Sequence, residues 1–373
     1  MIYLDYAATS PVDPEVLDTF VKVNKNFFAN TSSNHKIGFE AAQLELKARQ
    51  QVANLFNVTS NEVLFTSGAT ESNNLAIKGV AFKYQNRGKH IITSLGEHAS
   101  VLNSFKLLEE EFGFRVTYLS LNQEGKIDIE ELKKALTDDT ILVSIMAVNN
   151  EVGAINPIEE IGRILKKYPK LYFHVDATQA IGKVKINYQD VDLISMSAHK
   201  IGGFKGSGIL IKKDKIDLMP LFNGGGQELG LRSGTTNYPY AVAASKALRI
   251  ALERQEERYE YVKKLNEYLV KELKAIPGIE FNSPKDASPY ILNFHVNKKG
   301  SVVSEALSNQ EFYVSTQSAC SSKKTSFSHV LVAMGKDMDV ASNSLRVSLS
   351  YLTKKEELVA FIKTLKQILN SIK

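Results

Sequence analysis

The sequence predicts an α/β fold, with a large domain built on a seven-stranded, mainly parallel sheet and a smaller α+β domain. Between about residues 60 and 213, short apolar runs alternate with amphipathic segments, which is typical of a parallel sheet covered by helices. After Gly234, a long charged helical stretch leads into a mixture of strand-like and helical segments. The chain has 373 residues, more than one hydrophobic core usually supports, so two domains are expected.

The elements follow in chain order. Amphipathic segments such as 129–136 and 158–165 separate seven apolar runs, which we expect to be the strands of the large sheet: 62–65, 90–93, 116–119, 140–148, 171–175, 192–197 and 208–211. A helical stretch over 240–276, ended by Pro277-Gly278, should link the two domains. In the second domain, 290–296 and 345–350 are expected to be strands, and 301–308 and 355–371 helices.

These patterns predict domain boundaries. The large domain should span 13–250. The small domain should comprise 1–12 and 251–373, with a mobile cysteine loop around 315–328.

Composition places the chain among globular proteins, with 43% hydrophobic and 23% charged residues. The net charge of +5 comes from lysines spread along the chain, which permits an acidic partner, and we expect no direct contact with nucleic acid. No apolar run is long enough to span a membrane, and the first residues lack a signal-peptide pattern, so a cytoplasmic location is expected. The single Cys320 excludes an internal disulfide and a multi-cysteine metal site, and no bound metal is expected.

Lys200 and Asp176 predict the cofactor. Asp176 follows the apolar run 171–175, and Lys200 closes the run Ser195-Met196-Ser197-Ala198-His199-Lys200. In α/β sheets, ligands bind at the carboxyl ends of the strands, where both residues fall. A lysine can hold pyridoxal phosphate as a Schiff base, and a carboxylate keeps the pyridine nitrogen protonated so that the ring accepts electrons. Either residue alone would be an ordinary strand end, but together they predict a pyridoxal phosphate site.

Other polar residues at strand ends complete this site. The segment Phe65-Thr66-Ser67-Gly68-Ala69-Thr70-Glu71 lies between a strand and a helix, so its N–H groups could bind the phosphate, although such a segment is also an ordinary helix cap. Two residues apart in an extended run, Ser197 and His199 could donate to the same phosphate. Gln179 could bond the phenolic oxygen of the cofactor. Asn150 ends another core strand, or Asn149-Asn150 is simply a turn.

Cys320 has two interpretations. A lone cysteine is most often a small buried hydrophobic residue. Here its neighbours over 317–326 are polar, small and basic, which suits an exposed mobile loop and favours the thiolate. Mobility would let a sulfur-carrying cysteine visit both the substrate and an acceptor.

The ordered motifs resemble those of the pyridoxal-phosphate-dependent cysteine desulfurases of the NifS/IscS family. The resemblance runs over nearly the whole chain, through the segments 3–9, 65–75, 97–98, 148–153, 174–179, 197–200, 224–235, 318–322 and 344–349. It implies the aminotransferase-like fold type I, a homodimer, and conversion of L-cysteine to L-alanine with the sulfur left as a persulfide on Cys320.

The resemblance also implies individual roles. Lys200 matches the Schiff-base lysine, Cys320 the sulfur carrier and His98 the histidine that stacks on the ring and moves protons. The remaining cofactor contacts match Asp176 at the pyridine nitrogen, Gln179 at the phenolic oxygen, Ala69, Thr70, Ser197 and His199 at the phosphate, and Asn150. Thr235 matches a phosphate ligand from the other subunit. Arg346 matches the residue that binds the substrate carboxylate, and either Asn30 or Asn34 should meet the substrate.

The chain departs from the family pattern at Gln317, where glycine is usual, and at Phe204, where proline is usual. Two other classes stay open: a different fold type I enzyme, such as an aminotransferase or a selenocysteine lyase, and a non-catalytic scaffold. The sulfur acceptor could be a tRNA-thiolating enzyme, an iron–sulfur scaffold or a carrier for thio-cofactor synthesis. The short segment after the last expected helix favours tRNA thiolation.

Overall fold

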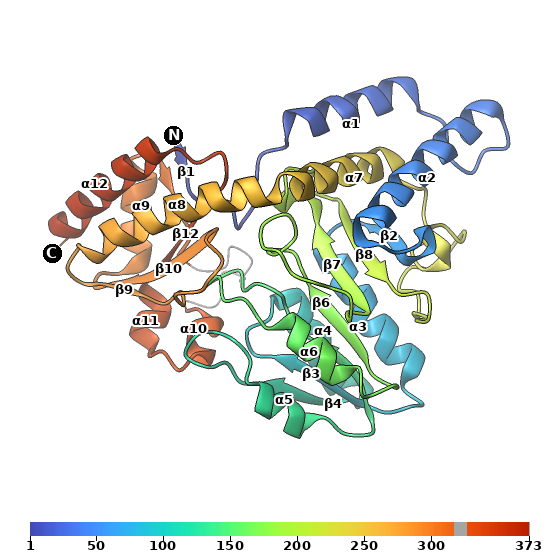
Figure 1. Ribbon diagram of the computed structural model, residues 1–373, viewed down its shortest axis with the longest axis horizontal. Coiled ribbons are helices and arrows are strands. Elements are labelled where there is room, and N and C mark those ends of the chain that lie inside the picture. The colour runs from blue at the N-terminus through green and yellow to red at the C-terminus, as the bar shows by residue number, and fades with distance from the viewer. Residues whose placement is uncertain (317–326, 373) are drawn as a thin grey trace.

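The computed structural model describes residues 1–316 and 327–372. Its centre is a seven-stranded sheet in the order β2-β8-β7-β6-β5-β3-β4 (Figure 1). The only antiparallel pairings within this sheet are those of β8 with β2 and β7. The predicted seven-stranded, mainly parallel sheet is therefore confirmed. Its strands are β2 (Val63–Thr66), β3 (His90–Ser94), β4 (Arg115–Leu119), β5 (Thr140–Ser144), β6 (Tyr172–Asp176), β7 (Leu193–Ser197) and β8 (Gly208–Lys212).

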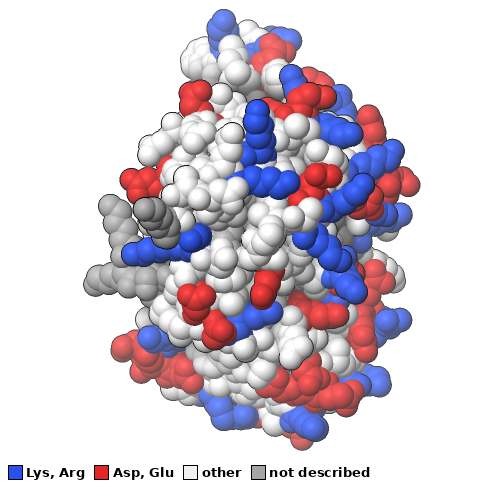
Figure 2. All heavy atoms as spheres, turned by 90° about the vertical axis from the view of Figure 1, so that its left-hand side faces the viewer, with Lys and Arg blue, Asp and Glu red and all other residues white. Residues whose placement is uncertain are grey.

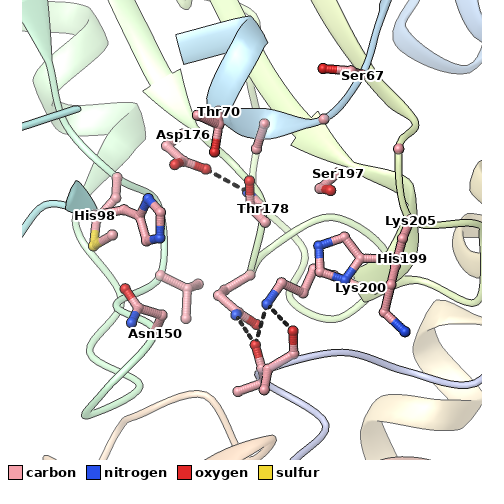
Figure 3. A pocket seen from close by; sticks show the side chains of 18 of the residues that line it. Ser67, Thr70, His98, Asn150, Asp176, Thr178, Ser197, His199, Lys200 and Lys205 are labelled. Carbon is pink, nitrogen blue, oxygen red and sulfur yellow. Dashed lines mark hydrogen bonds between the residues drawn. The ribbon is translucent and has the colours of Figure 1, made fainter. Parts of the chain in front are cut away.

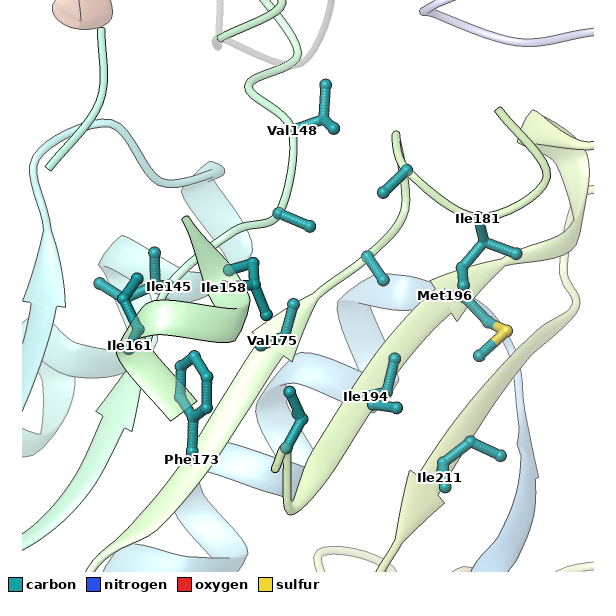
Figure 4. Close-up of a cluster of buried hydrophobic side chains, with 14 of the residues drawn as sticks. Ile145, Val148, Ile158, Ile161, Phe173, Val175, Ile181, Ile194, Met196 and Ile211 are labelled. Atoms are coloured by element: carbon teal, nitrogen blue, oxygen red, sulfur yellow. The ribbon is translucent and has the colours of Figure 1, made fainter. Parts of the chain in front are cut away.

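Two layers of helices bury the faces of this sheet. One face packs against α3 (Ala69–Tyr84) and α4 (Ala99–Phe112). The other face packs against α2 (Lys36–Phe56), α5 (Ile129–Ala135), α6 (Ile158–Leu165) and α7 (Tyr238–Glu253), and α1 (Pro14–Asn26) lies on α7. Neighbouring strand residues alternate between the two faces: Ile209 and Ile211 of β8 belong to the core on the second face, and Leu210 to the core on the first. Figure 4 shows part of the core on the second face, with Ile211 among its side chains.

The rest of the chain forms a smaller sheet with its own core. β12 (Ser344–Ser348), β10 (Ile291–Val296) and β9 (Ile279–Phe281) are antiparallel. They pack with α8 (Gln255–Lys274), α9 (Gly300–Ser308) and α12 (Lys355–Ser371). The chain start joins this unit, because β1 (Ile2–Tyr3) pairs with β11 (Phe312–Tyr313). The short helices α10 (His329–Ala333) and α11 (Met338–Asn343) follow, and their buried residues Val330, Leu331 and Ala341 join the core of the large sheet. The boundaries at residues 12 and 250 remain a prediction.

Three elements differ from the sequence-based expectation. The strand expected over 140–148 ends at Ser144. Beyond it, the N–H groups of Ile145 and Ala147 still bond carbonyls of β6, while Asn156 bonds the Met146 carbonyl. The helical stretch over 240–276 is two helices that meet at Arg254, whose φ of −103° and ψ of 11° break the α-helix. The sequence pattern did not predict α1 or α2. Short 3₁₀ turns lie at Ser60–Glu62 (η1), Ala198–Lys200 (η2) and Glu228–Gly230 (η3).

Acidic and basic side chains are intermingled on the face shown in Figure 2, with uncharged areas between them. This agrees with the small net charge of the chain. Of the helices in the described part of the chain, none is both long enough and apolar enough to cross a bilayer.

Candidate active site

A cavity of about 360 Å³ opens at the carboxyl edge of the large sheet, where the ends of β2, β6 and β7 meet the N-terminal segment. Its lining combines basic, acidic, amide and hydroxyl side chains from six separate stretches of chain (Figure 3). They are Ala7, Ala8, Ser67, Gly68, Ala69, Thr70, His98, Met146, Val148, Asn150, Asp176, Thr178, Gln179, Ser197, His199, Lys200, Lys205, Gly206 and Arg346. Ten of the predicted site residues therefore share one cavity: Ala69, Thr70, His98, Asn150, Asp176, Gln179, Ser197, His199, Lys200 and Arg346.

Lys200 lies in the η2 turn directly after β7, so its side chain starts from the edge of the sheet. Its Nζ donates to the carbonyl oxygens of Ala7, at 2.5 Å, and Ala8, at 2.6 Å. These carbonyls belong to the chain start, which crosses the mouth of the cavity (Figure 3). The amine is thus held in the cavity by neutral backbone acceptors.

Asp176, the last residue of β6, supplies a fixed and buried carboxylate with 5% exposure. Its Oδ2 accepts from Asn73 Nδ2 at 2.8 Å, and its Oδ1 accepts from the Thr178 backbone N–H at 3.0 Å. A carboxylate held by two donors keeps its position. It can therefore act as the anionic partner of a protonated nitrogen in the cavity.

The N-terminus of α3 faces the same cavity and is open. Its first residue follows Gly68, whose φ of +153° suits only glycine, and no side chain caps it. Close packing also needs small residues here, since a side chain on Gly208 would come within 2.5 Å of the Gly68 Cα. The uncapped N–H groups and the helix dipole favour an anion at Ala69 and Thr70.

Ser197 and His199 lie beside this helix end. The sequence placed both in one extended run, but Ser197 ends β7 and His199 lies in η2. Both nevertheless line the cavity. Burial, with Lys200, Lys205 and Lys183 nearby, lowers the pKa of His199 to about 4, so its imidazole is neutral and can donate one N–H. The cluster of cations around it is another feature that favours a bound anion.

His98 stands on the opposite wall, at the start of α4. Its Nδ1 accepts from the Ser100 backbone N–H at 3.2 Å and lies 2.8 Å from the Ser100 hydroxyl. These contacts fix the ring plane at the N-cap position. The ring lies beside Asp176 and across the cavity from His199 (Figure 3).

Arg346, in β12, brings the small sheet to the site. Its side chain is 2% exposed. Nη2 pairs with Asp5 Oδ1 at 2.8 Å, and Nη1 donates to the Asn150 carbonyl at 2.9 Å. Nε is buried and has no hydrogen-bond partner among the described residues. A buried donor without a partner at a cavity wall is suited to an acceptor on a ligand. Asn150 therefore acts through its backbone here, six residues after the end of β5.

Three predicted residues do not line this cavity, and a fourth falls outside the described part of the chain. Asn30, Asn34 and Thr235 are exposed on the same chain and do not line it. Cys320 lies outside the described residues, as does Gln317. The unusual Phe204 packs between Phe20 and Tyr240, with ring centroids 4.5 and 5.6 Å away, which accounts for an aromatic residue at this position.

Sequence reasoning missed other parts of the site. The partner of Asp176 is Asn73, one turn after Thr70 on α3, and this helical spacing was the available signal. Lys205 follows Lys200 in a glycine-rich loop and lines the cavity. The acceptors of Lys200, the carbonyls of Ala7 and Ala8, carry no sequence signal because every residue has a carbonyl.

Comparison with known proteins identifies the family. Residues 2–361 match the family described as aminotransferase class-V. The chain belongs to this family. As a class-V aminotransferase relative of the cysteine desulfurases, it is a pyridoxal-phosphate-dependent enzyme.

The class-V relatives cover almost the whole chain. A NifS/IcsS protein homolog of Lactobacillus delbrueckii subsp. bulgaricus is 45% identical over 99% of this chain and 97% of its own length. Cysteine desulfurase IscS of Dictyoglomus turgidum is 41% identical over 100% and 95%. The human protein named cysteine desulfurase is 42% identical over 95% and 79%.

Solved structures agree with the class-V fold. A NifS-like protein superposes with a TM-score of 0.93 at 40% identity and covers 100% of both chains. SspA, solved in complex with cysteine, has a TM-score of 0.83 at 35% identity and covers 95% of this chain and 100% of its own. The predicted fold type I architecture is confirmed.

The described residues fit the class-V cofactor. The open N-terminus of α3 suits the phosphate, and Asp176 provides an anion for the pyridine nitrogen. Between them, Thr178 Oγ1 lines the cavity and is buried without a hydrogen-bond partner in the described structure. An orphaned hydroxyl at this place is expected where a ligand completes the site.

Proposed function

We propose that the chain is a cysteine desulfurase that converts L-cysteine to L-alanine and leaves the sulfur as a persulfide on Cys320. The observation that carries this proposal is the meeting of Lys200, Asp176 and Arg346 in one cavity, with Ser315, five positions before the single cysteine, bonded to Arg346. The relatives named cysteine desulfurase support the same activity.

Each of the predicted residues in the cavity has a proposed task. Lys200 binds the cofactor covalently, and Asp176 keeps the pyridine nitrogen protonated. Ala69, Thr70, Ser197 and His199 hold the phosphate, Gln179 donates to the phenolic oxygen, and His98 stacks on the ring with Asn150 nearby. When bound, pyridoxal phosphate withdraws electrons from the Cα of an attached amino acid.

The protein groups then act on the substrate. Arg346 binds the L-cysteine carboxylate through its buried Nε and orients the Cα–H bond toward the Lys200 amine. The Lys200 amine is placed to take the Cα proton of the bound substrate. The Cys320 thiolate attacks the substrate sulfur, so an S–S bond forms as the C–S bond breaks. The released electron pair takes up a proton, and alanine leaves.

The ends of the Cys320 segment support this assignment. Before it, the backbones of Ser315 and Arg346 exchange two hydrogen bonds, of 2.6 and 3.1 Å. After it, Ser328 bonds Glu151, and His329 Nε2 lies 3.2 Å from the Glu97 carbonyl oxygen. Cys320 is five positions after Ser315, a reach of at most about 18 Å. A thiol on so short a tether from Arg346 can reach a substrate in the cavity.

We also propose that the active protein is a homodimer. Thr235 would then complete the phosphate site of the partner subunit, and Asn30 or Asn34 would approach a substrate there. Their exposure on one chain and absence from its own cavity are compatible with that arrangement. Assembly is measured by size-exclusion chromatography with light scattering, and a monomer with full activity would reject it.

The sulfur acceptor is proposed to be a tRNA-thiolating enzyme, with an iron–sulfur scaffold or a thio-cofactor carrier as alternatives. Deletion of the gene should remove thiolated tRNA and spare iron–sulfur enzymes. Loss of iron–sulfur enzymes with thiolated tRNA retained would indicate that the acceptor is an iron–sulfur scaffold.

The deciding experiment is a single turnover. The cofactor-loaded protein is incubated with one equivalent of L-cysteine without reductant, and alanine and the intact mass at Cys320 are measured. Alanine together with one added sulfur establishes the desulfurase. A keto acid in place of alanine would indicate an aminotransferase, and neither product would reject the proposed substrate.

A further inference from the structure

Lys183 is a second buried lysine beside the cavity, and none of the tasks proposed for the site involves it. It lies four residues after Gln179 in the turn that follows β6 and is 9% exposed. Gly182, with a φ of +69°, shapes this turn, and a side chain there would lie 2.6 Å from the Ala251 Cβ of α7. The turn is therefore clamped against α7, which directs Lys183 inward.

Lys183 contacts the candidate site through Gln179. Its Nζ donates to Gln179 Oε1 at 2.9 Å. The other end of the same carboxamide, Nε2, donates to the Ala7 carbonyl at 2.9 Å, the carbonyl that also accepts from Lys200. A protonated lysine has only donors, so the oxygen of the amide must face it. The N–H groups of Gln179 consequently face the cavity side, and the second of them is available for a ligand.

The surroundings of Lys183 contain more cations than anions. No carboxylate lies within 4 Å of its Nζ in the described chain, and its nearest aromatic neighbour is Tyr290, with the ring centroid at 6.0 Å. Arg258 and Tyr6 line a small adjoining cavity of about 40 Å³ together with Lys183 and Lys200. Burial, Lys200 and Arg346 lower the pKa of Lys183 to about 7. An anionic ligand in the main cavity would favour its charged form.

We propose that Lys183 is a positioning residue that fixes the Gln179 carboxamide with its N–H groups toward the phenolic oxygen of the cofactor. Without this donor, the amide could turn over and present its oxygen to an oxygen of the ligand, which would be repulsive. The positive charge behind the amide also strengthens its N–H as a donor. The inference rests on the proposed place of Gln179 at that oxygen.

The test reads the cofactor and needs no substrate. Wild type, Lys183→Met and the exposed control Lys185→Met are loaded with pyridoxal phosphate, and visible absorption is recorded against pH. Lys183→Met should raise the pH midpoint of the absorption change by roughly one pH unit. Loss of the Lys183 charge and reorientation of the Gln179 amide both favour the protonated form at Lys200 Nζ. Lys185→Met should leave the midpoint unchanged.

Two further variants separate positioning from charge alone. Lys183→Arg keeps a charged donor, has room in the adjoining cavity, and should restore the midpoint. In a Gln179→Leu background, Lys183→Met should shift the midpoint by half as much or less, because the residue through which it acts is missing. An equal shift in both backgrounds would overturn the proposal, as would a Lys183→Met midpoint equal to that of wild type.

Two further measurements distinguish a variant that does not fold from a protein that lacks desulfurase activity. If Lys183→Met does not fold, Lys183→Leu, which also lacks a donor, is titrated in its place, and an unchanged midpoint there overturns the proposal equally. Alanine formation is measured separately on wild type. Absence of alanine with the expected midpoint shifts would reject the desulfurase and leave the role of Lys183 standing.

Discussion

Glu97 gives a stability prediction that can be worked from the structure. It lies beside His98 and is fully buried, and burial raises its pKa from 4.5 to about 8. Oε1 accepts from the Ser94 hydroxyl at 2.9 Å and from the Met146 N–H at 2.7 Å, while Oε2 has no partner in the described structure. This is the pattern of a neutral carboxyl group that keeps its proton on Oε2 at pH 7.

The sign of the pH dependence follows from that pKa. Below pH 4.5, Glu97 is protonated in both the folded and the unfolded protein, so its protonation does not favour either state. Between pH 4.5 and 8 the unfolded protein loses this proton and the folded protein keeps it, so the free energy of unfolding falls as the pH rises. The slope is about 1.4 kcal/mol per pH unit, and the whole loss is at most roughly 5 kcal/mol.

Glu97→Gln removes the titration and keeps the shape of the side chain. Urea unfolding of the cofactor-free protein is followed by circular dichroism between pH 5 and 8, because the chain has no tryptophan to report by fluorescence. The stability of the variant relative to wild type should rise by about 3 kcal/mol over this range. Glu111→Gln, at an exposed position, should show no such trend. Parallel pH profiles for Glu97→Gln and wild type would refute a neutral Glu97.

Three substitutions test the proposed chemistry. Lys200→Ala should abolish both covalent attachment of the cofactor and alanine formation. Attachment is measured by mass spectrometry after borohydride treatment and denaturation. A variant that still carries the cofactor would reject the lysine assignment. Cys320→Ala should keep the visible absorption of the bound cofactor yet release almost no sulfide from L-cysteine, and full activity would mean that this thiol is not the carrier. Arg346→Lys should raise KM for L-cysteine by about 100-fold, because a lysine cannot bind the carboxylate, Asp5 and the Asn150 carbonyl at the same time as the three guanidinium nitrogens do. An unchanged KM in steady-state assays would mean that another residue binds the substrate carboxylate.

The sequence determined the α/β architecture and the positions of Lys200 and Asp176 at the ends of two strands. Short apolar runs indicate buried strands, and the amphipathic segments between them indicate helices. Both patterns depend only on neighbouring residues, so they can be recognised in the sequence. Lys200 and Asp176 follow such runs, and parallel strands bring their carboxyl ends to one edge, so the order of residues along the chain is enough to predict their proximity. The sequence did not predict where β5 ends: the run 140–148 stays apolar after Ser144 because the segment beyond the regular strand is also buried.

Only the tertiary structure decided what surrounds those two residues. Asn73 meets Asp176 across 103 residues, and Asp5 meets Arg346 across 341. The carbonyls that hold Lys200 come from the chain start, and Lys183 reaches the site through the turn at Gly182. Such contacts depend on how separate elements pack, and a local pattern of residue types carries no information about which distant backbone will lie beside a given side chain. The residues that carry the proposed chemistry can therefore be predicted from the sequence, whereas the groups that hold those residues in place depend on the tertiary structure.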